Sequence, residues 1–277
     1  MEMKKDGITP ADFFPKCVYI TPRLYMLGVT LNAVGLNNPG AERALNEFGW
    51  ENYPTPFMVS FSPEGVTATE RIENTKTFVD AFNTSPVGRS VRKDIGFQLN
   101  ISCPNTKHNP AELAGEAEGL LSATEELRIP KVVKINALTP MEAALRIARH
   151  PACNAISPTN TIPYGQLPGA IDWVGMFGSQ DPQHSPLAQR YGGNPNMAGG
   201  LSGKPIRPVI CDWVAQAKRE GMLEHCHING GGGIMEADDI NEFARVGAGS
   251  VSLGVIGMLR PWRMVGCIHR AKAMFRY

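Results

Sequence analysis

The sequence lacks three features: a long apolar run, an excess of one charge and a closely spaced pair of cysteines. Its longest apolar stretch, around Val251–Met258, is far shorter than the ~18 to 20 residues of a membrane-spanning helix. The N-terminus, Met1–Asp6, is too polar for a secretory signal. With 27 Lys and Arg against 26 Asp and Glu, the net charge favours neither nucleic acid nor an anionic membrane as a partner. These absences predict a soluble, cytoplasmic, globular protein.

Six cysteines are scattered along the chain, and none forms a C-x-x-C pair. This spacing predicts reduced thiols rather than a disulfide framework. The triplet His225-Cys226-His227 is the strongest hint of a metal site. Adjacent residues of a strand point to opposite faces, and no second cluster of ligands accompanies the triplet, so we expect no metal.

Short β-rich runs followed by amphipathic helical stretches recur along the 277 residues, which predicts α/β units around a parallel sheet. We expect six strands, at residues 57–61, 95–101, 131–135, 154–157, 225–228 and 250–254. Helices are expected at residues 66–82, 111–127, 140–149, 205–220, 236–246 and 261–275. The run Thr139-Pro140-Met141-Glu142 predicts a capping box with proline at the first helical position.

Two regions depart from this rhythm. The residues before Phe57 hold at most a hairpin at Leu24–Leu31 and a helix at Ala41–Phe48. Residues 163–203 are rich in Gly, Pro, Gln and Asn, which predicts an irregular insertion or lid loop. No shift in composition marks a boundary, so residues 1–277 are predicted to form a single domain.

Polar groups follow several of the predicted strands. Asn100 ends one strand, and Cys103 and Asn105 come directly after it. Two amides suit a heterocyclic imide or a carboxylate, and a thiol beside them can act as a base. A turn around a structural cysteine is the alternative. The segments Asn154–Thr161 and Leu31–Gly40 bring further Asn, Thr and Gly, which turn formation alone also explains.

Two glycine turns, Asn229–Ile234 and Ser252–Val255, follow the last two strands. In a barrel, this is where backbone N–H groups bind phosphate; a flexible turn is the alternative. Lys134 ends an apolar strand and needs a partner there. That partner is either a ligand oxygen, such as that of an anionic flavin ring, or a neighbouring carboxylate.

Taken together and in order, these segments resemble the dihydroorotate dehydrogenases over about residues 22–271. The matching motifs are Asn32–Asn38, Asn100–Asn105, Lys134, Thr159–Thr161, Gly199–Gly203, Gly232–Ile234 and Gly254. The resemblance implies a TIM (β/α)8-type barrel with FMN as cofactor. It also implies oxidation of dihydroorotate to orotate, a step of pyrimidine biosynthesis. Cys103 stands where the membrane-associated class has Ser, so the soluble, cysteine-base class is expected.

The resemblance also implies roles for single residues. Cys103 would be the catalytic base, and hydride would pass to FMN. The substrate would be bound by Asn32, Gly35, Leu36, Asn100, Asn105, Asn160 and Thr161. The cofactor would be held by Asn100, Lys134, Gly203, Gly232, Gly233, Gly254 and Val255, where the family usually has Thr at the last position. A homodimer or an electron-transfer partner subunit is an expected partner, and the acceptor is fumarate, NAD through a partner, or quinone.

Six strands are fewer than the eight of a closed barrel, so we expect a barrel that is incomplete at its N-terminal side. Three hypotheses remain at this point. The chain is a working flavoenzyme whose missing strands are replaced by its N-terminal segment or a partner chain. It is a truncated, catalytically impaired homologue. Or it is another FMN-dependent pyrimidine oxidoreductase, similar to the dihydropyrimidine dehydrogenases.

Overall fold

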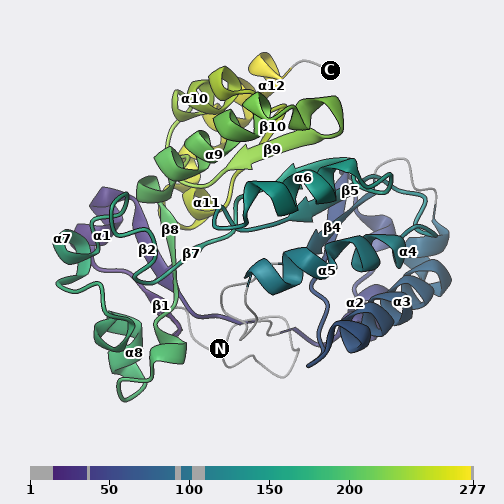
Figure 1. The fold of residues 1–277 in the computed structure, drawn as a ribbon, viewed down its shortest axis with the longest axis horizontal. Helices are drawn as coiled ribbons and strands as arrows, with labels where there is room; N and C mark the ends of the chain where they lie inside the picture. Colours follow the sequence, from purple (N-terminus) through teal and green to yellow (C-terminus); the bar gives the residue numbers. More distant parts are fainter. Residues whose placement is uncertain (1–14, 36–37, 91–94, 102–109, 276–277) are drawn as a thin grey trace.

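The computed structural model describes residues 15–35, 38–90, 95–101 and 110–275. These residues form one parallel sheet of six strands and one antiparallel sheet of four strands. Figure 1 shows the antiparallel sheet on the left of the view and the parallel strands to its right. The arrangement is an α/β fold of the TIM-barrel type with an open, curled sheet.

The parallel sheet confirms all six predicted strands. In spatial order its strands run β10-β9-β6-β5-β4-β3, so β3 and β10 are its edges. The bounds are β3 Phe57–Phe61, β4 Ile95–Asn100, β5 Lys131–Lys134, β6 Ala155–Ser157, β9 His227–Gly231 and β10 Ser250–Ser252. Each predicted range overlaps its strand, because a short apolar run between turn residues is what a strand covered by helices requires.

The apolar core lies between this sheet and the helices on one of its faces. Along β4 every second residue is buried, including Phe97 and Leu99. Phe78 of helix α3 (Ala68–Thr84) stacks on Phe61 and Phe97, with ring centroids 4.3 and 5.5 Å apart. The alternate residues, such as Gln98 and Asn100, are therefore directed to the opposite, inner face of the sheet.

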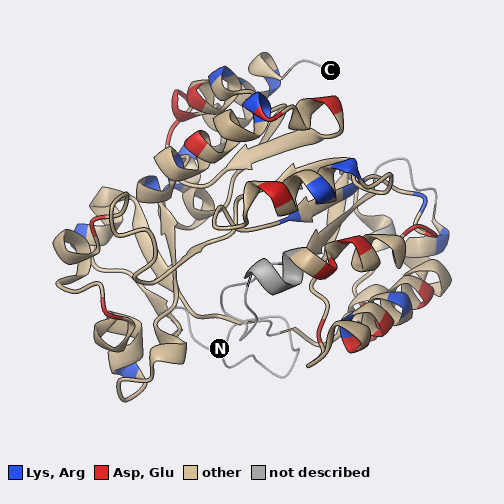
Figure 2. Cartoon of the chain, viewed as in Figure 1, with Lys and Arg blue, Asp and Glu red and all other residues tan. Residues whose placement is uncertain are grey.

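Helices follow the predicted strands. Those that match a prediction are α2 Ala41–Glu47, α3, α5 Pro110–Ser122, α6 Met141–Arg149, α9 Arg207–Arg219, α10 Asp239–Val246 and α12 Met264–Met274. Five shorter helices were not predicted: α1 Pro22–Leu27, α4 Pro86–Arg89, α7 Trp173–Phe177, α8 Pro186–Arg190 and α11 Val255–Leu259. Figure 2 shows charged residues mainly on the outer helices, while the strands carry few.

The capping box predicted at residues 139–142 is wrong. Helix α6 has Pro140 at its N-cap, with no side-chain hydrogen bond there. The Thr139 hydroxyl is buried and has no hydrogen-bond partner within the described part of the chain, while the Thr139 backbone N–H donates to the Asn136 carbonyl. A capping box does form at α3, where Thr67 and Glu70 exchange bonds to each other's backbone N–H groups.

The hairpin predicted at Leu24–Leu31 is also wrong. Leu24 lies in α1, and the strand that follows, β2 (Val29–Asn32), pairs antiparallel with β1 (Val18–Tyr19). The helix forms because Thr21 caps it and proline stands in its first turn.

The segment at residues 163–203 holds several short elements between turns. It contains α7, α8 and strand β8 (Gly200–Gly203), which pairs with β2 and with β7 (Ile162–Pro163). The second sheet, in the order β1-β2-β8-β7, therefore joins the start of the described chain to this segment. A role of this segment as a lid stays a prediction.

A buried ion pair between helices α3 and α5 gives a test of the packing. Arg71 donates to Glu116 over 2.8 Å, and both side chains are at most a tenth exposed. Glu116→Ala leaves the guanidinium buried without its main counter-charge, which should lower the free energy of unfolding by about 3–5 kcal/mol. Urea denaturation measures this change.

The matched control is the exposed pair Arg43–Glu47 of α2. Glu47→Ala should change the free energy of unfolding by less than about 0.5 kcal/mol, because solvent screens that pair. Equal losses in the two variants would contradict the packing described here.

Candidate functional site

A cavity of about 270 Å³ lies at the carboxyl ends of the parallel strands. Its wall comes from segments that are far apart in the sequence. The lining residues are Gln98, Lys134, Thr159, Asn160, Thr161, Ser202, Gly203, Ile206, Gly232, Gly233, Ile234, Ser252, Leu253, Gly254 and Val255. This edge of the sheet is where α/β barrels place their ligands.

Lys134 is the charged group of this cavity wall. It ends β5, and the strand register places it beside Asn100 of β4 on one side and Ser157 of β6 on the other. The described residues that line the cavity include no Asp or Glu. A cation in the wall of this cavity suits a ligand that carries negative charge.

Two of the glycine turns touch each other. A Cβ atom added at Gly233 would lie 2.7 Å from the Gly203 carbonyl oxygen, and one at Gly203 would overlap the Gly28 carbonyl. Both glycines have a positive φ, of +79° and +111°. Backbone packing therefore already requires glycine at these two positions.

Gly254 differs from them. Its φ of −113° lies outside the left-handed region that favours glycine, and a Cβ atom added there would meet no atom within 4 Å. Neither a left-handed backbone nor packing among the described residues explains the absence of a side chain at this point of the cavity wall. A ligand that approaches the backbone closely would explain it.

An amide and several hydroxyl groups form a network on the inner face of the sheet. The Asn229 Oδ1 atom accepts hydrogen bonds from the hydroxyls of Ser157 and Ser252, and its amide donates to Ser250 over 2.8 Å. Ser157 also bonds the Thr159 hydroxyl, at 2.9 Å. The network thus connects β9 to its two neighbours in the sheet, β6 and β10, and to Thr159 of the cavity wall.

The loop after β6 is held by a buried amide. Asn136 donates from its side chain to the Thr161 carbonyl over 2.5 Å. The hydroxyl of Thr161 is buried at the cavity and has no hydrogen-bond partner among the residues that the structure describes. A buried hydroxyl without a partner is a donor available to a ligand.

The structure brings many of the predicted site residues together. Those that line the cavity are Lys134, Asn160, Thr161, Gly203, Gly232, Gly233, Gly254 and Val255. Asn100 is linked to them, because the Asn160 amide donates to its Oδ1 atom over 3.2 Å.

Two predicted residues lie elsewhere. Asn32 ends β2, paired with Gly200, and Gly35 follows it with a φ of +71°. Neither lines this cavity. Cys103, Asn105 and Leu36 are outside the described residues.

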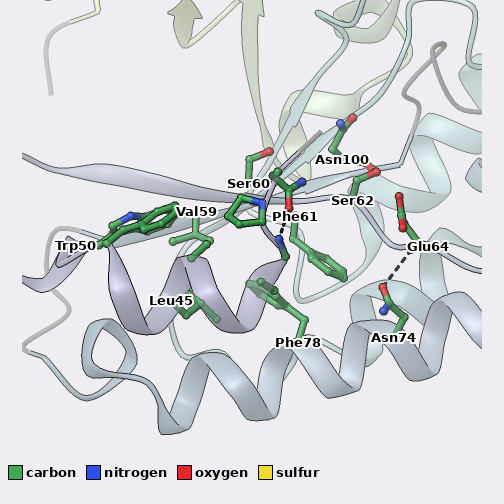
Figure 3. Close-up of a pocket in the computed structure, with 16 residues that line it drawn as sticks. Leu45, Trp50, Val59, Ser60, Phe61, Ser62, Glu64, Asn74, Phe78 and Asn100 are labelled. Carbon is green, nitrogen blue, oxygen red and sulfur yellow. Dashed lines mark hydrogen bonds between the residues drawn. The ribbon is translucent and has the colours of Figure 1, made fainter. Parts of the chain in front are cut away.

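A larger cavity, of about 520 Å³, lies beside the edge strand β3 (Figure 3). Leu45, Trp50 and Phe78 give it an apolar wall, and the Glu64 backbone N–H bonds the Asn74 side chain over 3.1 Å at one side. Asn100 also borders it, so this side chain stands between the two cavities. Its larger volume favours this cavity as the ligand site, but Lys134 and the glycine turns line the smaller one.

The sequence analysis gave no role to several wall residues, among them Gln98, Thr159, Ser202 and Ser252. Thr159, Ser202 and Ser252 stand inside the segments that it singled out, whereas Gln98 does not. Strand alternation could have found Gln98, because it lies two residues before Asn100.

Two further observations concern metals and membranes. No three His, Cys, Asp or Glu side chains come together as a metal site in the described part of the chain. Within residues 15–35, 38–90, 95–101 and 110–275, no helix combines the length and the apolarity needed to cross a bilayer.

Curated relatives of this sequence share one name. The chain is 29% identical over 238 residues to dihydroorotate dehydrogenase A (fumarate) of Limosilactobacillus reuteri, covering 83% of this chain and 68% of that protein. It is 26% identical over 242 residues to the catalytic subunit of dihydroorotate dehydrogenase B (NAD(+)) of Fusobacterium nucleatum, with 84% and 68% covered. The corresponding subunit of Bacillus pumilus is 28% identical over 251 residues, with 87% and 70% covered. No protein-family model matches the chain.

Solved structures agree on the fold. The ligand-free dihydroorotate dehydrogenase of Eimeria tenella superposes with a TM-score of 0.63 and covers 95% of this chain and 72% of that one. A second structure of the same enzyme, in complex with ferulenol, gives a TM-score of 0.59. The sequence identity is 16% in both, so these neighbours support the barrel-type fold alone.

The two kinds of glycine can be separated by experiment. Gly203→Ala should lower the free energy of unfolding by more than about 2 kcal/mol, because the methyl group overlaps a carbonyl and the φ is positive. Gly254→Ala should change it by less than about 0.5 kcal/mol, because its methyl group enters open space. Urea titration of the ligand-free protein measures both, and a large loss at Gly254 would contradict the open cavity wall.

Proposed function

The chain belongs to the dihydroorotate dehydrogenase family, and from this premise we propose that it oxidises dihydroorotate to orotate with FMN as cofactor. It is an oxidoreductase of the kind that serves pyrimidine biosynthesis. The observation that carries the proposal is the single cavity in which Lys134, the glycine turns and the Asn160–Thr161 loop meet.

The residues of this cavity fit the phosphate of FMN. The backbone N–H groups of Gly203, Gly232, Gly233, Gly254 and Val255 would surround it, and the open space at Gly254 would admit it. Val255 lacks the hydroxyl that the family has after this glycine. Ser202 and Ser252 line the same cavity, and their hydroxyls would serve as donors in its place.

The remaining wall would hold the flavin ring. Lys134 would lie near its anionic edge, where a fixed positive charge stabilises negative charge that develops during reduction. Asn100, beside Lys134 in the strand register, would add an amide contact. When bound, FMN supplies the two-electron acceptor for the hydride that leaves the substrate.

Paired amides would orient the pyrimidine. Asn100 and Asn160 already share a hydrogen bond, so their side chains are held in one geometry without a ligand. The Thr161 hydroxyl, for which the described residues offer no partner, would bond the substrate. Asn32, Gly35, Leu36 and Asn105 would complete the contacts. Such positioning contributes to catalysis by holding the reacting carbons in place.

Cys103 would act as the base that removes a proton from the carbon beside the substrate carbonyl. This role rests on its place after Asn100 and on the family resemblance. A homodimer or an electron-transfer subunit remains the proposed partner, since the relatives include both fumarate-dependent and NAD-dependent enzymes.

The proposed reaction is tested directly by adding dihydroorotate to the FMN-loaded protein without oxygen. The flavin absorbance near its visible maximum should fall, and orotate should form in equal amount. If FMN stays bound and dithionite reduces it but dihydroorotate does not, the proposed substrate is wrong. Dihydrouracil is tested in parallel, and reduction by dihydrouracil alone would favour the dihydropyrimidine dehydrogenase alternative.

Cys103→Ala should slow flavin reduction by roughly 10²–10⁴-fold, the contribution of a general base, while FMN stays bound. Stopped-flow absorbance measures the rate. Cys267→Ala is the control, because Cys267 is buried on α12 and lines none of the described site. Equal rates in the Cys103 variant and the parent protein would remove Cys103 from the mechanism.

Gly254→Val should weaken FMN binding by at least about tenfold, because its side chain would occupy the space proposed for the phosphate. Gly266→Val on α12 is a matched control, since an added Cβ atom meets nothing within 4 Å there either and the position is remote from the cavity. Fluorescence titration with FMN measures both affinities. A Gly254 variant that binds FMN as tightly as the control would place the phosphate elsewhere.

A further inference from the structure

Two cysteines come together at the amino end of the parallel sheet, at the opposite end from the candidate cofactor site. Cys153 precedes β6 and Cys226 precedes β9, and these strands are neighbours with Ala155 paired to His227. The His227 N–H donates to the Asn154 carbonyl over 3.0 Å, so the pairing continues up to the two cysteines. Neighbouring strands lie about 4.8 Å apart, which is within the Cα separations that a disulfide spans.

The two thiols are neighbours in this sheet, and both are buried. The Cys153 thiol donates to the Ala155 carbonyl over 3.6 Å. Interaction with Cys153 lowers the pKa of the Cys226 thiol; burial opposes this shift, and the backbone at Ile156 adds to it. Interaction with Cys226, together with burial, raises the pKa of Cys153. Cys226 is therefore the better nucleophile of the pair.

A cavity gives solutes access to this pair. Its volume is about 470 Å³, and both cysteines line it. The titratable and charged groups in the same wall are Arg149, His150, Glu224, His225 and His227. The side chains of His225 and His227 are exposed, so the cavity opens to solvent at this end of the sheet.

We propose that Cys153 and Cys226 form a thiol–disulfide exchange site for low-molecular-weight disulfides that enter this cavity. In the first step the Cys226 thiolate attacks one sulfur of the small disulfide, and the other sulfur leaves as a thiolate. In the second step Cys153, after losing its proton, attacks the Cys226 sulfur and releases the second small thiol. In sum, two protein thiols lose two electrons and two protons, and one small disulfide becomes two thiols.

Two of the other described cysteines provide an internal comparison. Cys211 on α9 and Cys267 on α12 are also buried, and burial raises the pKa of each thiol, to about 11 for Cys211. Neither lines the cavity that Cys153 and Cys226 share. Non-specific oxidation would modify all of these thiols alike, whereas exchange at the proposed site would modify only Cys153 and Cys226.

The test is incubation of the folded full-length chain with oxidised glutathione, followed by blocking of free thiols and tryptic mapping without reductant. Residues 150–190 and 220–245 are separate tryptic peptides, and Cys153 and Cys226 are the only cysteines in them. We expect these peptides to be linked, at least about tenfold more often than any link through Cys211 or Cys267, and separated by dithiothreitol. This measurement needs no variant.

Two variants sharpen the result. In Cys153→Ser the exchange should stop after its first step, so that Cys226 carries glutathione. Cys211→Ala should leave the linked peptides unchanged. The proposal is overturned if the folded parent chain keeps both thiols free, or if its Cys226 accumulates as the glutathione adduct without the link to Cys153. A control chain, unfolded in urea and treated in the same way, should react at all its cysteines, which shows that the glutathione and the blocking reagent are active.

Discussion

The candidate site depends on the register of parallel strands. Because neighbouring strands start and end together, the residues at their carboxyl ends meet at one edge, however far apart they lie in the sequence. Asn100, Lys134 and Ser157 come from three different strands and stand side by side for this reason alone. The loops that follow then need only short excursions to close a cavity around Lys134. The chemistry of the site is thus a consequence of the sheet, and no single segment contains it.

The inner face of the sheet is polar because the core lies on the other side. Closed barrels fill their interior with branched apolar residues. In this chain the rings of Phe61, Phe78 and Phe97 stack on the helix-covered face, whereas the inner face carries the Asn229 network. The apolar burial that stabilises the fold therefore does not depend on filling the inner face, and that face can present hydroxyls and amides to a ligand.

The sequence was informative wherever local pattern decides the structure. All six parallel strands and the principal helices could be predicted, since each is a short apolar run or an amphipathic period between turn residues. The antiparallel sheet could not. Its pairing of β2 with β8 joins residues about 29–32 to 200–203, and two of its strands have only two residues. Contacts of that separation leave no local signal, so Pro163–Gly203 looked irregular. The cap at Thr139 was wrong on a local scale, since α6 begins one residue later, with Pro140 as its N-cap.

The predicted site also divides into features that a local sequence pattern reveals and features that only the folded structure explains. Glycines and a lysine at strand ends could be singled out from spacing, but spacing does not say why a glycine is needed. The structure separates the reasons: Gly203 and Gly233 are required by the backbone around them, while Gly254 is not. A glycine that neither a left-handed backbone nor packing demands is the stronger indication of a ligand. By this argument the phosphate proposal rests more on Gly254 than on the longer glycine run after β9, although that run is the more conspicuous feature of the sequence.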